Sequence, residues 1–296
     1  MATIAPAAHR AHHTASYRYR KVGKEVGFWA LLSVFIVFAG FPVYWMFITA
    51  FKQVNDLYNL QNNPFIFNLA PTFDQVTYLF QHTPYATWLA NTLEVGVLVV
   101  LITLVLCVPA AYVLARTKFP GSDALGIGIF LTYLVPPTLL FLPLAFVVAQ
   151  LHLFNNYLSL ILTYPTFLIP FCTWLLMGYF KGIPRELEEA ALVDGASRLQ
   201  AMTKIVLPLA LPGILSAGMF AFTLSWNEFL YSLIFMSDQA MKTIPVGVTS
   251  ELIRGDEFFW GQLMAAALLG SIPVALLYSF FVDYFVAGMT AGAVKG

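Results

Sequence analysis

Two stretches of this chain hold the side chains that could do chemistry. One is Trp226-Asn227-Glu228, followed by Tyr231, inside a long apolar run. A carboxylate at the centre of a membrane span costs about 2.5–3.5 kcal/mol to insert, and such residues usually face a bundle interior or a water-filled path. Aromatic faces beside an amide and a carboxylate can stack on a sugar ring and hydrogen-bond its hydroxyls. Asn227 and Glu228 could equally bond neighbouring helices or a partner subunit, so these residues leave both roles open.

The second stretch is residues 181–208, the longest charged interruption between apolar runs. Pro184 suits the first position of a helix, and the three glutamates after it suit the positive end of a helix dipole. Gly195 is placed to end that helix in a left-handed conformation. Ser197 with Gln200 predicts a capping box for a second helix. The stretch is therefore predicted to be a helical hairpin, and a soluble-looking hairpin between apolar runs needs a partner to dock on.

The elements that hold these two stretches are strongly apolar. Of the 296 residues 59% are hydrophobic and 10% charged, and the mean hydropathy is +0.77. No soluble globular domain needs that much apolar surface, which indicates a lipid bilayer as solvent and an all-α membrane protein. Prolines at 136, 137 and 143 predict a kinked or broken third span. Six spans are expected, at residues 26–51, 89–115, 124–151, 157–180, 209–236 and 262–285.

The distribution of basic residues predicts how these spans are oriented. Six spans put both termini and residues 181–208 on one side, together with the loop that contains Arg116. That side holds 12 of the 15 Lys and Arg residues, which predicts that it is cytoplasmic. Residues 1–25 are expected to form a basic, disordered cytoplasmic tail, and residues 288–296 a short flexible one. The partner of the hairpin must then be a cytoplasmic protein.

Residues 181–208 also match a known signature. Glu189-Ala190-Ala191 is followed after three residues by Gly195, and then by Ile205, Leu207 and Pro208. This resembles, at every fixed position, the EAA-x3-G-x9-I-x-LP loop of bacterial ABC importer permeases. The resemblance implies the type I importer permease fold, with this coupling loop docked on a cytoplasmic ATPase. The residues expected to couple to the ATPase are Glu188, Glu189, Ala190, Ala191, Asp194, Gly195, Ile205, Leu207 and Pro208.

An alternative for the coupling loop is an amphipathic segment that lies on the inner leaflet of the membrane. The three glutamates at positions 186, 188 and 189 disfavour this alternative, because the inner leaflet is anionic.

Other segments are similar to one branch of that family, the carbohydrate-importer permeases of the maltose type. They are Ala111-Tyr112, Ala115-Arg116, Phe119-Pro120-Gly121, Trp226-Asn227-Glu228 and the tail from Gly288 to Gly296. The resemblance implies a six-span permease domain over residues 26–287 in a bacterial inner membrane. It also implies four partners: a second homologous permease, an ABC ATPase dimer, an extracytoplasmic solute-binding protein, and a sugar or oligosaccharide. Trp226, Asn227, Glu228 and Tyr231 are the candidates for the substrate path, and the outer loops 52–88 and 237–261 for the surface that meets the binding protein.

Several activities are not expected of this chain. It has no G-x4-G-K-[ST] phosphate loop and no metal-ligand cluster, so we expect no cofactor or metal here, and ATP with Mg on the partner ATPase. A formal net charge of zero argues against a nucleic-acid binder. Three rivals remain: a secondary carrier with Glu228 and Glu94 as ion relays, a membrane scaffold without transport, and an ABC permease for another polar solute such as glycerol phosphate.

Overall fold

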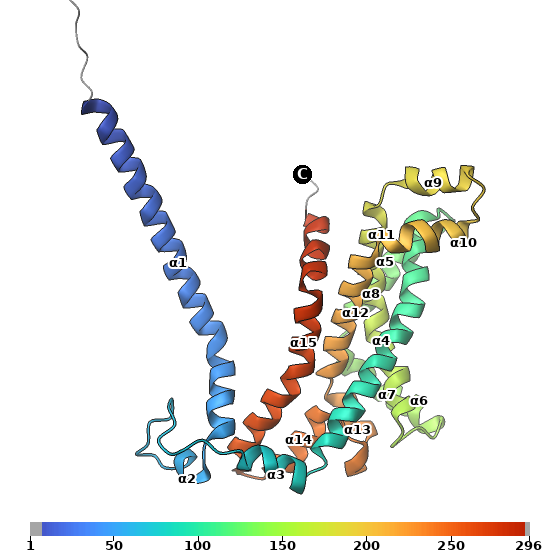
Figure 1. Ribbon diagram of the computed structural model, residues 1–296. Coiled ribbons are helices and arrows are strands. Elements are labelled where there is room, and N and C mark those ends of the chain that lie inside the picture. Colours follow the sequence, from blue (N-terminus) through green and yellow to red (C-terminus); the bar gives the residue numbers. More distant parts are fainter. Residues whose placement is uncertain (1–7, 294–296) are drawn as a thin grey trace, which may run out of the picture.

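The computed structural model describes residues 8–293, with the side chains of residues 23–282 and of Tyr284. It is almost entirely helical (Figure 1). A π-helical turn, Met202–Val206, joins α10 to α11, a 3-10 turn covers Gln239–Met241, and β1 (Ile253–Arg254) pairs antiparallel with β2 (Glu257–Phe258). The α-helices are α1 Ala8–Phe51, α2 Val54–Leu57, α3 Asp74–His82, α4 Tyr85–Arg116, α5 Ser122–Tyr133, α6 Pro137–Gln150, α7 Tyr157–Thr163, α8 Pro165–Gly182, α9 Arg185–Val193, α10 Arg198–Ala201, α11 Leu207–Leu209, α12 Leu211–Trp226, α13 Leu230–Phe235, α14 Ile244–Leu252 and α15 Trp260–Ala293.

The apolar helices agree with the six-span prediction. By length and composition four described helical segments could cross a membrane, and six if each of two bent helix pairs is one span. Helices α4, α8 and α12 pack together at the centre of the larger hydrophobic core. Their contact is close because Gly213 of α12 lies under the ring of Tyr179. A Cβ there would be 2.4 Å from the ring, so only glycine fits.

The third and fifth spans are broken, in different ways. The third span was expected to be kinked or broken, and α5 and α6 meet at 95° around Leu134–Pro136. The fifth was expected at residues 209–236, and the structure has breaks in the helix there that were not predicted. A bend of 74° at Ala210 separates α11 from α12, and three residues separate the end of α12 at Trp226 from the start of α13. The bend falls between Pro208 and Pro212, which both lack the N–H of a regular helix.

Both ends of the chain are more helical than expected. Helix α1 begins at Ala8, within the segment predicted to be disordered, and α15 continues to Ala293, within the predicted flexible tail. Residues 1–7 and 294–296 lie outside the described part. The first span stands apart from the other helices over most of its length (Figure 1). From residue 23, its side chains become buried only at Ile48, so most of this apolar helix has no partner within the chain.

Candidate functional site

The first half of the coupling loop is a helix with a tightly defined end. Pro184 is the N-cap of α9 rather than its first helical residue, which corrects the predicted position by one residue. The predicted left-handed residue is confirmed, because Gly195 has φ +89°. The N–H groups of Gly195 and Ala196 donate to the carbonyls of Leu192 (3.1 Å) and Ala191 (3.0 Å). These two bonds are those of a Schellman motif, so the turn of the hairpin is fixed by the backbone itself.

The second half of the coupling loop is a rigid arm into span five. The predicted capping box of Ser197 and Gln200 is confirmed. Helix α10 continues through the π turn into α11, where the N–H of Leu207 donates to the carbonyl of Met202, five residues back. Ile205 and Leu207 are half-buried, while Val206 between them lies in the main core. The arm is therefore anchored in the bundle by its apolar residues.

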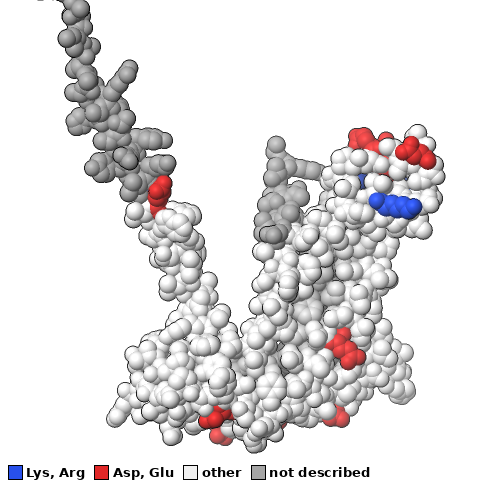
Figure 2. Space-filling model, in the orientation of Figure 1, with Lys and Arg blue, Asp and Glu red and all other residues white. Residues whose placement is uncertain are grey.

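Helix α9 presents an unpartnered surface. None of its residues is buried, and Glu189 and Ala190 of the signature are exposed. Exposed apolar side chains lie among the acidic ones, and Val193 is 88% exposed. Figure 2 shows Asp and Glu side chains gathered at this end of the molecule beside a basic patch, above helices that are nearly free of charge on the visible face. Such a mixed apolar and acidic surface is typical of a docking site.

Glu188 differs from its neighbours because it faces the bundle. Its side chain is 14% exposed, and it accepts a hydrogen bond from the hydroxyl of Tyr112 on α4. Its Oε2 lies 3.5 Å from Nε of Arg116, also on α4. Nη2 of Arg116 in turn donates to the carbonyl of Ile183 at 2.9 Å. The carboxylate therefore ties α9 to the end of α4, and we call Tyr112, Arg116, Ile183 and Glu188 the inner clamp.

The sequence did not predict the inner clamp. Tyr112 was noticed only as part of a family resemblance, Arg116 there and in the count of basic residues, and Glu188 was placed among the ATPase-coupling residues. A helical periodicity could have suggested the contact: Glu188 lies one residue before the exposed Glu189, and so points to another side of α9.

The second candidate stretch lies at the break between α12 and α13. Glu228 was expected within a continuous span, but it lies in this break, where it caps α13. Its carboxylate accepts hydrogen bonds from the backbone N–H groups of Tyr231 (2.9 Å) and Ser232 (3.2 Å). It also accepts one from the hydroxyl of Tyr164, at the junction of α7 and α8, at 2.7 Å. These contacts satisfy a carboxylate in an apolar bundle without a counter-charge.

Tyr231 extends this network to the third span. Its side chain is buried, and its hydroxyl donates to the carbonyl of Pro137, the first residue of α6, at 2.8 Å. The breaks in the third and fifth spans are thus held together through Tyr231 and Glu228. We call Tyr164, Glu228 and Tyr231 the break network.

Trp226 and Asn227 face the other way. They line a cavity of about 620 Å³ between the end of α12, α14 and α15, together with small residues of α15 such as Gly270 and Ser271. Nε1 of Trp226 donates to the carbonyl of Gly270 at 3.2 Å, and the exposed Asn227 bonds the carbonyl of Thr223 in its own helix. The four predicted substrate-path residues therefore belong to two separate places: Trp226 and Asn227 to a cavity, Glu228 and Tyr231 to the break network.

Neither place resembles a metal centre. In the described part of the chain, no three His, Cys, Asp or Glu side chains lie close enough together to hold a metal ion.

Bent apolar spans with an exposed helical hairpin at one end define a membrane transport subunit. Residues 104–291 match the family described as binding-protein-dependent transport system inner membrane component, and the chain belongs to this family. It is 35% identical to the diacetylchitobiose uptake system permease protein DasC of Streptomyces coelicolor, over 90% of this chain and 97% of that one. It is 36% identical to the sulfoquinovosyl glycerol transport system permease protein SmoH of Agrobacterium fabrum, over 93% and 95%.

The fold agrees with this family. A chain of a bacterial ABC transporter involved in the import of the acidic polysaccharide alginate superposes with a TM-score of 0.75, at 20% identity, over 96% of this chain and all of that one. The protein is accordingly a multi-pass permease subunit of a transport system. Its fold is that of ABC importer permeases.

Proposed function

We propose that this permease carries a sugar or oligosaccharide across a bacterial inner membrane, driven by an ATPase dimer docked on its coupling loop. ATP with Mg is hydrolysed on that partner and not on this chain. A second, homologous permease completes the path, and an extracytoplasmic binding protein delivers the solute. The observation that carries the proposal is α9, a well-ordered helix at the end of the bundle with no buried residue.

The surface of α9 supports an ATPase as its partner. A helix without a fully buried residue gains little stability from packing on its own chain. The Schellman motif and the inner clamp nevertheless fix its conformation, which suggests that it is preorganised for another protein. Exposed Leu187, Leu192 and Val193 offer apolar contacts, and Glu186 and Glu189 can meet basic groups. The excess of Lys and Arg on the side of the coupling loop supports a cytoplasmic location for it and for both termini.

The proposed mechanism is mechanical. Closure of the ATPase dimer on ATP would move the coupling loop, and the spans would rock from an inward-facing to an outward-facing state. The loop needs no chemistry of its own, because it only has to favour one of two conformations through differential contacts. The rigid arm α10–α11 carries that movement into span five.

The sugar class is supported by two observations. The relatives named above are permeases for diacetylchitobiose and sulfoquinovosyl glycerol, both of which contain sugar rings. The cavity beside Trp226 and Asn227 offers an aromatic face and an amide, with hydroxyls of Thr249 and Ser271. Such a set can stack on a ring and bond its hydroxyls.

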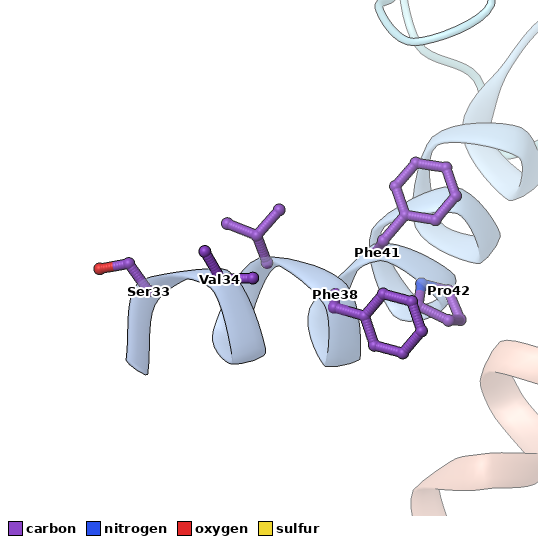
Figure 3. Close-up of a pocket in the computed structure, with 6 residues that line it drawn as sticks. Ser33, Val34, Phe38, Phe41 and Pro42 are labelled. Atoms are coloured by element: carbon purple, nitrogen blue, oxygen red, sulfur yellow. The ribbon is translucent and has the colours of Figure 1, made fainter. Parts of the chain in front are cut away.

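The isolated first span supports a second permease. A groove of about 630 Å³ is lined by Ser33, Val34, Val37, Phe38, Phe41 and Pro42, all from α1 (Figure 3). Phe38 is 80% exposed. In a bilayer this helix can meet lipid, and the part of it that stands clear of the bundle in Figure 2 could also meet spans of a partner.

The decisive experiment is Val193→Asp. It places a charge on an exposed apolar side chain without removing packing inside the chain. We expect the variant to lose most ATPase on co-purification and to lose ATP-driven uptake, because an unpaired charge is buried at the interface. Leu60→Asp is the matched control: Leu60 is 101% exposed in the loop after α2, away from α9, and ATPase association should stay normal. Normal association and uptake in Val193→Asp would refute the docking role.

The carrier alternative is tested in membrane vesicles without ATP. Uptake that follows an imposed proton or sodium gradient would favour it, while uptake that requires ATP favours the proposal. Normal complex abundance with no uptake of any solute would instead favour the scaffold.

A further inference from the structure

Helix α4 is bonded to the rest of the chain at both ends by specific polar contacts. At its C-terminal end, Tyr112 and Arg116 form the inner clamp with Glu188 and Ile183 of the coupling loop. Nη2 of Arg185 adds a longer contact, 3.4 Å, to the carbonyl of Ala115. The end of α4 therefore follows α9 if α9 moves.

The N-terminal end of α4 makes a second set of contacts, with the outer loop 237–261. Nε1 of Trp88 donates to the carbonyl of Gln239 at 2.7 Å. Nδ2 of Asn91 donates to the carbonyls of Ala240 (2.8 Å) and Lys242 (2.9 Å), and the N–H of Ile244 donates to Oγ1 of Thr92 at 2.8 Å. All three side chains are buried, with exposed fractions of 0%, 6% and 2%. We call Trp88, Asn91 and Thr92 the outer clamp.

Between the two clamps α4 has one continuous buried face. Its buried residues recur at four-residue intervals, so the buried stripe winds slowly around the helix while it stays in contact with the bundle. They include Val95, Val99, Thr103, Cys107, Ala111 and Ala115. Pro109 lies within the helix but does not interrupt it. From Trp88 to Arg116 the axis spans about 42 Å at 1.5 Å per residue.

The route from the coupling loop through the arm α10–α11 and α12 is discontinuous. The arm α10–α11 enters α12 through a 74° bend, and α12 ends at Trp226 before the outer loop is reached. Helix α4 runs unbroken from contacts with the coupling loop to contacts with the outer loop 237–261 (Figure 1).

We propose that α4 is a rigid strut that transmits movement of the coupling loop, through the inner and outer clamps, to residues 239–244 of the outer loop. This inference rests on the proposed docking of an ATPase at α9. It adds a direct mechanical link between the nucleotide state inside and the surface offered to a binding protein outside. The strut ends at the cavity, because Ile244 is one of the residues that line it. Coupling of this kind requires the strut to have two discrete positions, whose populations both ends can change.

The test measures hydrogen exchange in the whole transport complex in lipid nanodiscs, with and without ATP plus orthovanadate. Two reporters lie in this chain: the amides of Gly195 and Ala196 in the coupling loop, and the amide of Ile244, which donates to Thr92 in the outer clamp. In the wild type we expect ATP plus vanadate to change the exchange rates of the amides at both sites by about threefold or more. The exchange rate of an amide depends on the free energy of local opening, which changes when the contacts around it change. In Glu188→Gln and Tyr112→Phe, the change at Gly195 should remain and the change at Ile244 should disappear.

Glu25→Gln is the matched control, because Glu25 is an exposed glutamate of α1, outside both the inner clamp and the docking surface of α9. It should behave as the wild type at both reporters. A response at Ile244 that persists in both clamp variants would overturn the strut, and so would a wild type that responds at Gly195 but not at Ile244. If the wild type does not respond at Gly195, the proposed ATPase docking itself fails, and the strut fails with it.

Discussion

Two glutamates of this permease, Glu188 and Glu228, accept a hydrogen bond from a tyrosine of another helix but have different surroundings. Glu188 lies near the end of the bundle, 14% exposed, beside the guanidinium of Arg116. Glu228 lies in the break between α12 and α13, where its partners are two backbone N–H groups and the hydroxyl of Tyr164. One carboxylate has a counter-charge, and the other has only neutral donors.

The difference separates a movable contact from a structural one. Glu188 joins two elements that are remote in sequence, and each of its bonds can be exchanged for water when they separate. Glu228 closes the N-terminus of the short helix α13 that directly follows it. Without it, buried N–H groups would have no acceptor, which costs about 1–3 kcal/mol each. We infer that Glu188 serves transmission, while Glu228 holds the local fold of span five.

The largest effect is expected for Glu228→Leu. It removes the acceptor for Tyr164, Tyr231 and Ser232 at once, and we expect a loss of about 3 kcal/mol in stability from unpaired buried donors. Thermal unfolding of the purified complex in detergent measures this as a lower Tm. Glu94→Leu, at an exposed glutamate of α4, should change Tm little. A variant with normal Tm that loses only substrate affinity would instead make Glu228 a ligand of the solute.

The next effect is expected for Arg116→Gln, and on function more than on stability. Glu188 keeps Tyr112 and partial access to water, so we expect a stability cost of about 1 kcal/mol. Because the inner clamp is weakened, more ATP should be hydrolysed for each solute molecule imported. Parallel measurement of phosphate release and uptake in proteoliposomes gives this ratio. Arg185→Gln, which removes only the 3.4 Å contact to Ala115, is the control. An unchanged ratio in Arg116→Gln would remove the functional contrast between the two glutamates.

A smaller effect separates the two tyrosines. Tyr164→Phe deletes a hydroxyl from a side chain with 0% exposure and is expected to cost about 1 kcal/mol. Tyr112→Phe is expected to cost about half as much, because Glu188 keeps the cation of Arg116. Chemical unfolding of both variants side by side tests the order. Equal costs would mean that the counter-charge does not compensate for the lost hydrogen bond.

The smallest effect concerns a third carboxylate, Asp56, in the short helix α2. Burial raises its pKa, but hydrogen bonds from the side chain and N–H of Asn68, from Asn62 and from the N–H of Leu69 outweigh it, and the pKa lies below the ordinary 3.8. A lowered folded-state pKa contributes stability above 3.8, which is lost as the pH falls through the folded-state value. Unfolding followed below pH 4 should therefore be less acid-sensitive in Asp56→Asn than in the wild type. Equal acid sensitivity would show that these donors do not favour the charged form.

The sequence predicted the parts of the fold that depend on local chemistry. The left-handed Gly195 and the capping box of Ser197 follow from conformational preferences within a few residues, and both were found. The apolar runs predicted the spans, because a bilayer leaves few alternatives. The break after Trp226 was missed, since no proline or glycine marks it. The break depends on the carboxylate of Glu228, which accepts hydrogen bonds from backbone N–H groups in place of carbonyls. It also depends on Tyr164, which donates to Glu228 from 64 residues earlier in the chain.

The candidate site was predicted less completely than the fold. The exposed face of α9 follows from its composition, and the signature residues Glu189 and Ala190 lie on it. The contact of Glu188 with Arg116 was not predicted, because a contact between residues 72 positions apart leaves no periodic signal. Likewise, neighbours in sequence such as Asn227 and Glu228 were grouped together, although a change of chain direction sends them to opposite sides.

The π turn at Met202–Val206 has a consequence for the length of the coupling loop. A π turn holds one residue more than an α turn. Compared with a regular α-helix of the same length, the residues before the turn are therefore rotated about the helix axis by about 100° relative to those after it. The interval between Gly195 and Leu207 therefore sets an angular phase between α9 and the bundle. A loop shorter by one residue would keep every chemical group of the signature but would aim α9 in a different direction. In this chain, the spacing of the signature therefore sets the orientation of α9.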